Sequence, residues 1–214
     1  VHSVNVAILA VSLGSAISTN RRFLNSLGIG ALMHDVGKMS PELEALDVEH
    51  ELTGPEWDLM RMHPIYGAEI AASMRGLDRA AIVAILEHHM GYDLDGYPER
   101  RPRRAQHIMS RIVAIADSYD AMTADRHFAP AMRRDLALVE MAKRTGTAYD
   151  PALLRAFARM LGAFPPRSFV RLSTGEGAIV TRPTGVVTAP IVRADTTPAA
   201  APAWTRSGST RPTF

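Results

Sequence analysis

Residues 87–98 read EHHMGYDLDGYP, in which two adjacent histidines end an apolar run and a turn rich in Gly, Asp and Pro follows. A surface loop needs no histidine pair, and a packed core rarely contains one. The apolar stripe Ile82, Ile85 and Leu86 leads to His89, so the pair is predicted to face inward from the end of a helix. Side chains from other parts of the chain must therefore meet it.

The composition favours one core, alone or with a small appendage. The chain has 214 residues, of which 47% are hydrophobic. It contains no cysteine, so disulfides and thiolate metal sites are excluded, and any metal must be held by nitrogen and oxygen ligands. The net charge of +2 gives no general attraction to a nucleic-acid polymer or a membrane. The cluster of Arg100, Arg101, Arg103 and Arg104 fits either a solvated loop or an anion-attracting rim.

The apolar N-terminal segment does not predict membrane insertion. Residues 4–17 are too short to span a bilayer, and they lack the basic lead-in and cleavage site of a signal peptide. We therefore expect no membrane span and a cytoplasmic location. Because the chain begins with Val1 rather than Met, we also expect a longer parent protein with a domain upstream.

Apolar periodicity predicts helices through most of the chain. The first is apolar nearly all round and is predicted to be buried. Pro64 is expected to interrupt the helix that begins at the capping box. The predicted helices cover residues 2–18 and 22–35, the segment from the capping box Thr53-Gly54-Pro55-Glu56 to His63, the segment from the cap Asp78 to the histidine pair, and residues 104–124, 133–144 and 151–162.

The pattern changes after Pro165-Pro166. Residues 166–192 contain short β-rich runs broken by Gly and Pro, which predict two or three short strands. Residues 193–214 are rich in Ala, Pro and Thr and are predicted to be disordered. The expected fold class is therefore all-α, with a helical core to about residue 165 and a small C-terminal β appendage.

Five histidines and two aspartates are candidates for an inward-facing polar cluster. For each one alone, a hydrogen-bonded core group is the ordinary alternative, because a buried imidazole or carboxylate needs a partner. His50, His107 and His127 fit no metal pattern and are expected to be surface or structural residues. The candidates are His2, His34, Asp35, His63, His88, His89 and Asp117.

A pair of metal ions explains the seven candidates together more simply than seven separate core groups. Imidazole and carboxylate ligands suit Fe, Mn or Zn, and the sequence does not choose among them. Two ions roughly 3.5–4 Å apart hold a phosphate for in-line displacement. Asp35 is placed to bridge such a pair. Lys38 either contacts phosphate oxygens or stabilises the end of a helix.

The ordered motifs resemble the HD phosphohydrolase superfamily and, within it, the HD-GYP subfamily of bacterial cyclic di-GMP phosphodiesterases. The resemblance covers roughly residues 1–192. Its motifs are the His2-Ser3 pair, HDVGK at 34–38, His63-Pro64 with Gly67, the pair His88-His89, Gly96-Tyr97-Pro98, ADSYDAMT at 116–123, Tyr149-Asp150-Pro151 and LSTGE at 172–176.

The resemblance implies a helical domain around two or three divalent metal ions, usually iron or manganese. By motif position it makes the seven candidates metal ligands, with Asp35 bridging. Lys38 and Arg126 would contact substrate phosphates, and Gly96, Tyr97 and Pro98 would shape the loop over the site. The implied reaction is hydrolysis of cyclic di-GMP to linear pGpG and in some members GMP. Family members often have an upstream receiver or sensor domain, and we expect such a domain and a GGDEF-type protein partner here.

Four departures from the family pattern leave two other functions open. Met90 replaces the usual Glu, Leu94 replaces Gly, and Ala129 replaces a basic residue; a metal-binding Glu of some members would precede Val1. Because Leu tolerates fewer backbone conformations than Gly, we expect the loop to differ locally. The alternatives are a signalling module that binds without turnover, and an HD hydrolase for another cyclic dinucleotide or nucleotide.

Overall fold

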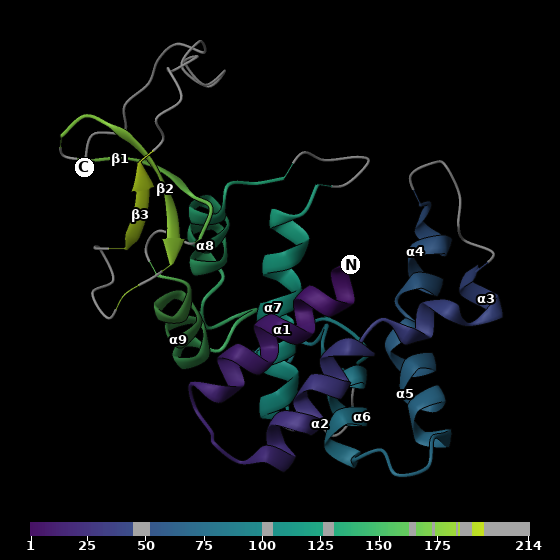
Figure 1. Ribbon diagram of the computed structural model, residues 1–214. Helices are drawn as coiled ribbons and strands as arrows, with labels where there is room; N and C mark the ends of the chain where they lie inside the picture. Colours follow the sequence, from purple (N-terminus) through teal and green to yellow (C-terminus); the bar gives the residue numbers. More distant parts are fainter. Residues whose placement is uncertain are drawn as a thin grey trace.

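The computed structural model describes residues 1–44, 52–99, 105–125, 131–162, 166–172, 174–182, 184 and 190–194. Helices make up the body of the molecule, and a small antiparallel sheet follows them, which confirms the predicted fold class (Figure 1). The helices are α1 (His2–Ser15), α2 (Arg21–Leu32), the 3₁₀ helix η1 (Val36–Met39), α3 (Pro41–Glu44), α4 (Gly54–Met60), α5 (His63–Ser73), α6 (Arg79–Glu87), α7 (Ile108–Thr123), α8 (Arg134–Lys143) and α9 (Pro151–Leu161).

Side-chain caps begin several helices where the sequence predicted them. Thr53 N donates to the Glu56 carboxylate at 2.7 Å, as a capping box requires. Asp78 caps α6 by accepting from Ala80 N, and Asp150 caps α9 by accepting from Ala152 N at 2.8 Å. The helix from the capping box is interrupted as predicted, but earlier than Pro64: α4 ends at Met60, and Pro64 lies in the first turn of α5, which begins at His63.

Several of the helix predictions need correction. α1 ends at Ser15 rather than at 18, and α7 begins at Ile108 rather than at 104. α2 ends at Leu32, so His34 lies in a turn rather than in the helix expected over 22–35. α1 is not buried on all sides, because Val4 and Ile8 are 52% and 60% exposed. α1 packs against α2, α7 and α9, and a helix that is apolar all round need not have a neighbour on every side.

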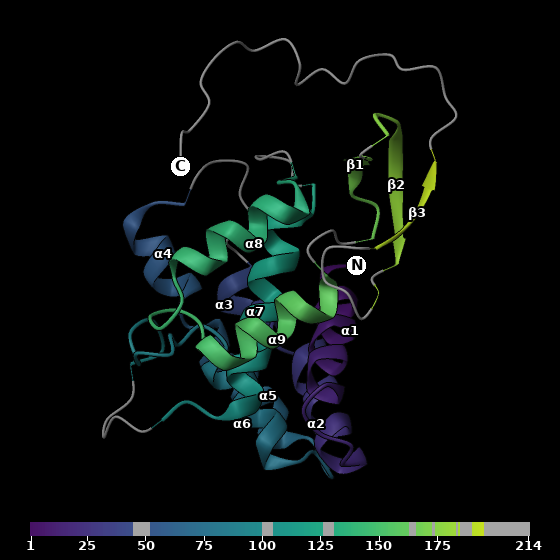
Figure 2. The same ribbon diagram turned by 90° about the vertical axis from the view of Figure 1, so that its left-hand side faces the viewer.

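α7 is the central element of the core. Ile112, Val113 and Ile115 on this helix are fully buried, and α1, α2, α6, α8 and α9 all contact it. At its C-terminal part, Tyr119 packs edge-on against Phe157 of α9, with ring centroids 5.2 Å apart. Figure 2 shows α8 and α9 covering one side of α7. This packing fixes the middle of α7, which carries one of the site residues.

The β appendage is a three-stranded antiparallel sheet in the order β1-β2-β3. Its strands are β1 (Phe169–Arg171), β2 (Gly177–Arg182) and β3 (Ile191–Ala194). Phe169 pairs with Ile179, and Val180 pairs with Val192. β3 ends at Ala194, two residues beyond the expected boundary at 192, and the predicted disordered tail from 195 onward lies outside the described residues. In the described ranges, no helix has the length and apolar character needed to cross a lipid bilayer.

Candidate metal centre

The seven predicted ligands come from five separate segments and gather at one place. His2 lies at the start of α1, and His34 and Asp35 lie in the turn between α2 and η1. His63 begins α5, His88 and His89 follow the last residue of α6, and Asp117 lies within α7. His34, His63 and His88 are each at most 2% exposed. Buried polar side chains of this kind need partners, and in these three histidines only Nδ1 has an ordinary one, a backbone carbonyl.

Three of the imidazoles are oriented in the same way. His34, His63 and His88 each place Nδ1 within 2.6–2.8 Å of the backbone carbonyl three residues earlier. A carbonyl only accepts, so Nδ1 is the protonated nitrogen and Nε2 is left as an acceptor in the neutral ring. Metal-ligating histidines are commonly held in this tautomer by the same kind of bond.

The first candidate group contains Asp35, His63, His88 and His89, whose ligand atoms all lie within 4.8 Å of one another. The Nε2 atoms of His63 and His88 are only 3.2 Å apart. With both Nδ1 atoms donating to carbonyls, two neutral rings would direct two lone pairs at each other, which is unfavourable unless a cation lies between them. The donor set therefore fits a divalent ion.

The second candidate group contains His2, His34 and Asp35. Nε2 of His34 is buried and has no hydrogen-bond partner among the described residues. It lies 3.5 Å from Asp35 Oδ2 and 3.6 Å from Asp117 Oδ1, and His2 Nε2 lies 3.1 Å from the same Asp117 oxygen. Asp117 is thus placed beside this group.

Asp35 belongs to both groups and directs one oxygen to each. Its Oδ1 is 3.4 Å from His63 Nε2 in the first group, whereas its Oδ2 faces His34 in the second. Lys38 Nζ lies 2.6 Å from Oδ2, with its side chain 44% exposed at the edge of the cluster. Although burial raises the pKa of Asp35, Lys38 and the neighbouring histidines lower it to about 2. The carboxylate is therefore ionised at neutral pH and can bridge two cations.

The two groups differ in the direction of their histidine pKa shifts. Burial lowers the pKa of His63, lowers that of His88 well below the usual value, and lowers that of His89 to about 4. The hydrogen bond to Asp117 raises the pKa of His2. Burial opposes protonation of His34, but Asp117 and Asp35 outweigh it and raise its pKa. Protons therefore compete for the second group far more than for the first.

This difference predicts a stepwise loss of metal on acidification. On acidification His2 and His34 bind protons first because their pKa values are raised above the ordinary histidine value, whereas His89 resists protonation until about pH 4. We expect the metal content to fall from about two ions to about one per chain between about pH 7.5 and 5. Equilibrium dialysis at several pH values followed by elemental analysis measures this. Loss of both ions in a single step would contradict it.

Two residues that hold the site in place, Asp120 and Glu87, were not predicted from the sequence. Asp120, one turn after Asp117, is buried and contacts His2 Nδ1 at 2.6 Å, which orients that ring. The i, i+3 spacing of the two aspartates was the available signal. His107, expected to be a surface or structural residue, is the N-cap of α7. His50 and His127 lie outside the described residues.

The buried Glu87 fixes the end of α6 against the start of α7. Its carboxylate accepts from His107 N at 2.9 Å and from Ser110 Oγ at 3.0 Å. Gln106 Nε2 donates to the carbonyls of Glu87 and Met90, both at 3.0 Å. These bonds hold the backbone on both sides of His88 and His89, so the pair has little freedom to turn away from the other ligands.

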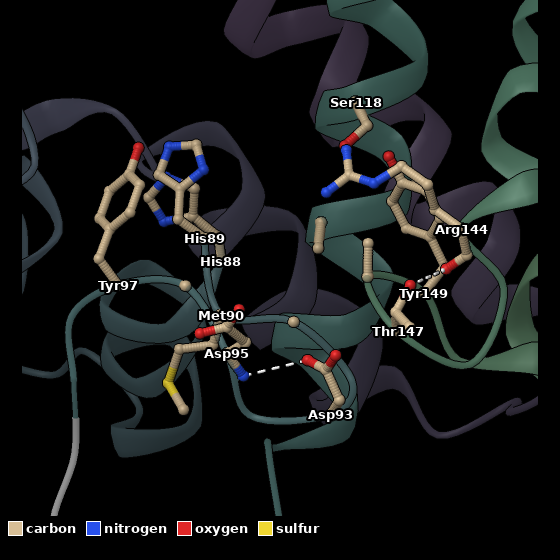
Figure 3. Close-up of a pocket in the computed structure, with 14 residues that line it drawn as sticks. His88, His89, Met90, Asp93, Asp95, Tyr97, Ser118, Arg144, Thr147 and Tyr149 are labelled. Carbon is tan, nitrogen blue, oxygen red and sulfur yellow. Dashed lines mark hydrogen bonds between the residues drawn. The ribbon is translucent and has the colours of Figure 1, made fainter.

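The loop after the histidine pair folds back over the site (Figure 3). Met90 pairs with Gly96, whose φ of 95° and close approach to the His89 carbonyl leave no room for a side chain. The Tyr97 ring lies 4.6 Å from that of His89, and the Tyr97–Pro98 bond is cis. Burial raises the pKa of Tyr97 to about 12, so its hydroxyl remains a donor.

Leu94 adopts the left-handed conformation that glycine favours, with φ at 70°. A non-glycine residue in this region costs about 1–2 kcal/mol. Leu94→Gly removes this cost but also increases the conformational entropy of the unfolded chain, which opposes folding. The net result expected is a rise of about 1 kcal/mol in the free energy of unfolding. Urea denaturation of both proteins measures the change, and a less stable variant would show that burial of the leucine side chain outweighs the strain.

The predicted substrate contacts divide into residues that the structure describes and residues outside the described ranges. Arg126 and Ala129 lie outside the described residues, as do Arg100, Arg101, Arg103 and Arg104. Lys38 is placed at the edge of the cluster, and Gly96, Tyr97 and Pro98 lie in the loop beside it.

Known proteins with similar sequences are phosphodiesterases. A cyclic di-GMP phosphodiesterase of Pseudomonas aeruginosa is 32% identical over 179 residues, covering 84% of this chain and 43% of that protein. A cyclic di-GMP phosphodiesterase of Vibrio cholerae is 33% identical over 63% of this chain and 29% of its own length. A 3′3′-cGAMP-specific phosphodiesterase of V. cholerae is 30% identical over 77% and 35%. The chain thus spans less than half the length of these relatives.

Solved structures share the fold. The HDG"Y"P protein from Bdellovibrio bacteriovorus aligns with a TM-score of 0.60 at 19% identity, over 75% of this chain and 51% of that one. A cyclic GMP-AMP specific phosphodiesterase of V. cholerae aligns with a TM-score of 0.57 at 18% identity, over 75% and 43%. The model of the HD domain family matches residues 2–153. The resemblance seen in the motifs is confirmed: the chain belongs to the HD domain family.

Proposed function

We propose that this chain is a metal-dependent phosphodiesterase that hydrolyses cyclic di-GMP to linear pGpG, with GMP as a further product. The observation that carries the proposal is the sharing of Asp35 between two groups of potential metal ligands. The relatives named cyclic di-GMP phosphodiesterases support the choice of substrate.

We assign the metal ions to the two groups that meet at Asp35. The first would be held by Asp35, His63, His88 and His89, and the second by Asp35, His2 and His34, with Asp117 beside it. Imidazole and carboxylate donors suit iron, manganese or zinc, and the proposed choice of iron or manganese rests on the resemblance to the HD-GYP subfamily. Bound ions would activate a water molecule and offset the charge of the phosphate.

The chain's own residues position the substrate. Lys38 lies beside Asp35 with an exposed ammonium group that can bind a non-bridging phosphate oxygen. The protonated Tyr97 hydroxyl, in the loop over His89, is a further donor at the edge of the site. Hydrolysis adds hydroxide to phosphorus and breaks its bond to the 3′ oxygen, which gains a proton, so the product has a 5′ phosphate and a free 3′ hydroxyl.

A direct assay tests the proposal. The chain is purified without air, loaded with Mn²⁺ or Fe²⁺, and incubated with cyclic di-GMP while the products are separated. We expect pGpG to accumulate. A chain with full metal occupancy that binds cyclic di-GMP but yields no product would instead be a signalling module without turnover.

A second candidate substrate follows from the relatives that are named 3′3′-cGAMP-specific phosphodiesterases. The same metal centre would hydrolyse either dinucleotide, because both contain 3′–5′ phosphodiester bonds. Comparing kcat/KM for the two substrates separates these functions.

The remaining expectations concern the cellular setting. We propose that the chain acts in the cytoplasm, where it would remove a second messenger. We also propose control by an upstream receiver or sensor domain and contact with a GGDEF-type protein. Pull-down of such a protein by the full-length parent tests the latter.

A further inference from the structure

A cavity of about 410 Å³ lies directly beside the candidate metal centre (Figure 3). His88 and His89 line one side, so the cavity and the metal centre share these residues. The loop at 90–97 forms its floor, and the turn at 144–149 after α8 forms the opposite wall. A volume of this size accommodates one nucleoside of a larger ligand.

Backbone hydrogen bonds join the loop at 90–97, which forms the floor, to the turn at 144–149, which forms the opposite wall. Tyr92 N donates to Ala148 O at 3.3 Å, and Asp93 N donates to Thr147 O at 3.0 Å. Within the loop, Gly91 N donates to Asp95 O at 2.6 Å. The cavity is therefore already formed in the protein without a ligand, which reduces the entropic cost of binding.

Arg144 offers hydrogen-bond donors in this cavity. Its guanidinium carbon lies 5.8 Å from the centroid of the Tyr149 ring, and Tyr149 is buried. In the part of the chain that the structure describes, no hydrogen bond or ion pair engages the guanidinium group. Figure 3 shows the side chain turned toward Ser118, across the cavity from the histidine pair. A cation held in this way is available to a ligand.

Asp95 offers an acceptor from the loop. Asp93 Oδ1 is already occupied, since it accepts from Asp95 N at 3.0 Å. No described residue makes a hydrogen bond or ion pair with the carboxylate of Asp95 itself, which also lines the cavity. Among the described residues, the cavity therefore combines a donor fork and an acceptor that have no hydrogen-bond or ion-pair partner.

We propose that this cavity is a guanine subsite, in which Arg144 donates to O6 and N7 of the base and Asp95 accepts from its N1–H and N2 amino group. Guanine has acceptors at O6 and N7, where arginine binds it in a bidentate manner. Adenine has an amino group at position 6 and a lone pair at N1, so it would oppose both contacts. The inference rests on the proposed function, because it names the part of the substrate that lies beside the metal centre.

Substitution of Arg144 tests the subsite. Arg144→Gln is expected to lower kcat/KM for cyclic di-GMP about 10- to 100-fold, as the loss of a bidentate contact worth about 1–3 kcal/mol implies. The fold-loss in kcat/KM for cyclic di-AMP is expected to be at least about tenfold smaller than that for cyclic di-GMP, because adenine makes no such contact. Lys143→Gln is the matched control: Lys143 is the adjacent cation, is paired with Glu140, and does not line the cavity.

A second variant separates base recognition from phosphate binding. Arg144→Lys keeps the charge but loses the planar fork, so a guanine contact is lost and a phosphate contact is retained. We expect Arg144→Lys to lower kcat/KM for cyclic di-GMP about tenfold, with little change in thermal stability. Equal losses on cyclic di-GMP and cyclic di-AMP in both variants would overturn the subsite.

The products from 3′3′-cGAMP give an independent readout. If its guanine occupies the cavity, only one of its two phosphodiester bonds reaches the metal centre, so the metal-loaded wild type should form one linear dinucleotide. Arg144→Gln should form both. An equal mixture from the wild type would overturn the subsite while leaving the proposed function intact. Absence of hydrolysis of cyclic di-GMP and of the base-free substrate bis(p-nitrophenyl) phosphate would overturn both.

Discussion

Replacing Asp35 by alanine is expected to lower phosphodiester hydrolysis by about a thousandfold or more. Asp35 is the residue common to both candidate metal groups, with Oδ1 toward His63 and Oδ2 toward His34. Bridged metal ions supply several kcal/mol of transition-state stabilisation, and about 4 kcal/mol corresponds to a thousandfold in rate. Metal content should fall from about two ions per chain to one or fewer, which elemental analysis after air-free purification measures.

Asp58→Ala is the matched control for that substitution. Asp58 lies on α4, its side chain is 76% exposed, and it pairs only with Arg61 among the described residues. A surface pair of this kind contributes less than about 1 kcal/mol, so rate and metal content should stay close to wild type. An Asp35→Ala protein with the wild-type rate and two bound ions would show that the two groups do not share a bridging ligand.

The sequence predicted the helices well because their signals are local. Caps and apolar periodicity depend on residues within a few positions of each other, and Asp78 and Asp150 begin helices where expected. The exposed face of α1 was not predictable, because periodicity records how apolar a helix is and not which neighbours it has. Val4 and Ile8 are apolar but are exposed, because the helices that pack against α1, which are α2, α7 and α9, do not cover them.

The candidate site was predictable in its residue types and less so in its geometry. Histidines at the ends of apolar stripes indicated an inward-facing cluster, and the family motifs gave their order. The turn at His34 was missed because the apolar pattern of α2 continues past the point where the helix ends. The roles of Asp120 and Glu87 depend on contacts across 118 and about 20 residues of sequence, which no local pattern records.

Gly37→Ala is expected to lower the free energy of unfolding by about 3 kcal/mol and to reduce activity as well. Gly37 is buried in η1, directly after the His34-Asp35 turn. A Cβ atom there would lie 1.9 Å from the carbonyl oxygen of His63 and 2.5 Å from the amide nitrogen of Gly67. Both atoms belong to the backbone of α5, so no side-chain rotation relieves the overlap, and overpacking of this kind costs about 1–3 kcal/mol or more. Urea denaturation measures the loss of stability.

The same substitution at Gly54 separates this close approach from the general effect of replacing glycine. Gly54 begins α4, and no atom lies within 4 Å of its hypothetical Cβ, so Gly54→Ala should be neutral or slightly stabilising. To make room for the added Cβ atom, the Gly37 variant must move η1 away from α5. That movement also separates Asp35 from His63, which lie 3.4 Å apart and both belong to the first metal group. Metal content should therefore fall at the first group even where the variant remains folded. A stable Gly37→Ala protein with full metal content would mean that the turn can shift without moving Asp35, and that this glycine is not what holds the two ligands together.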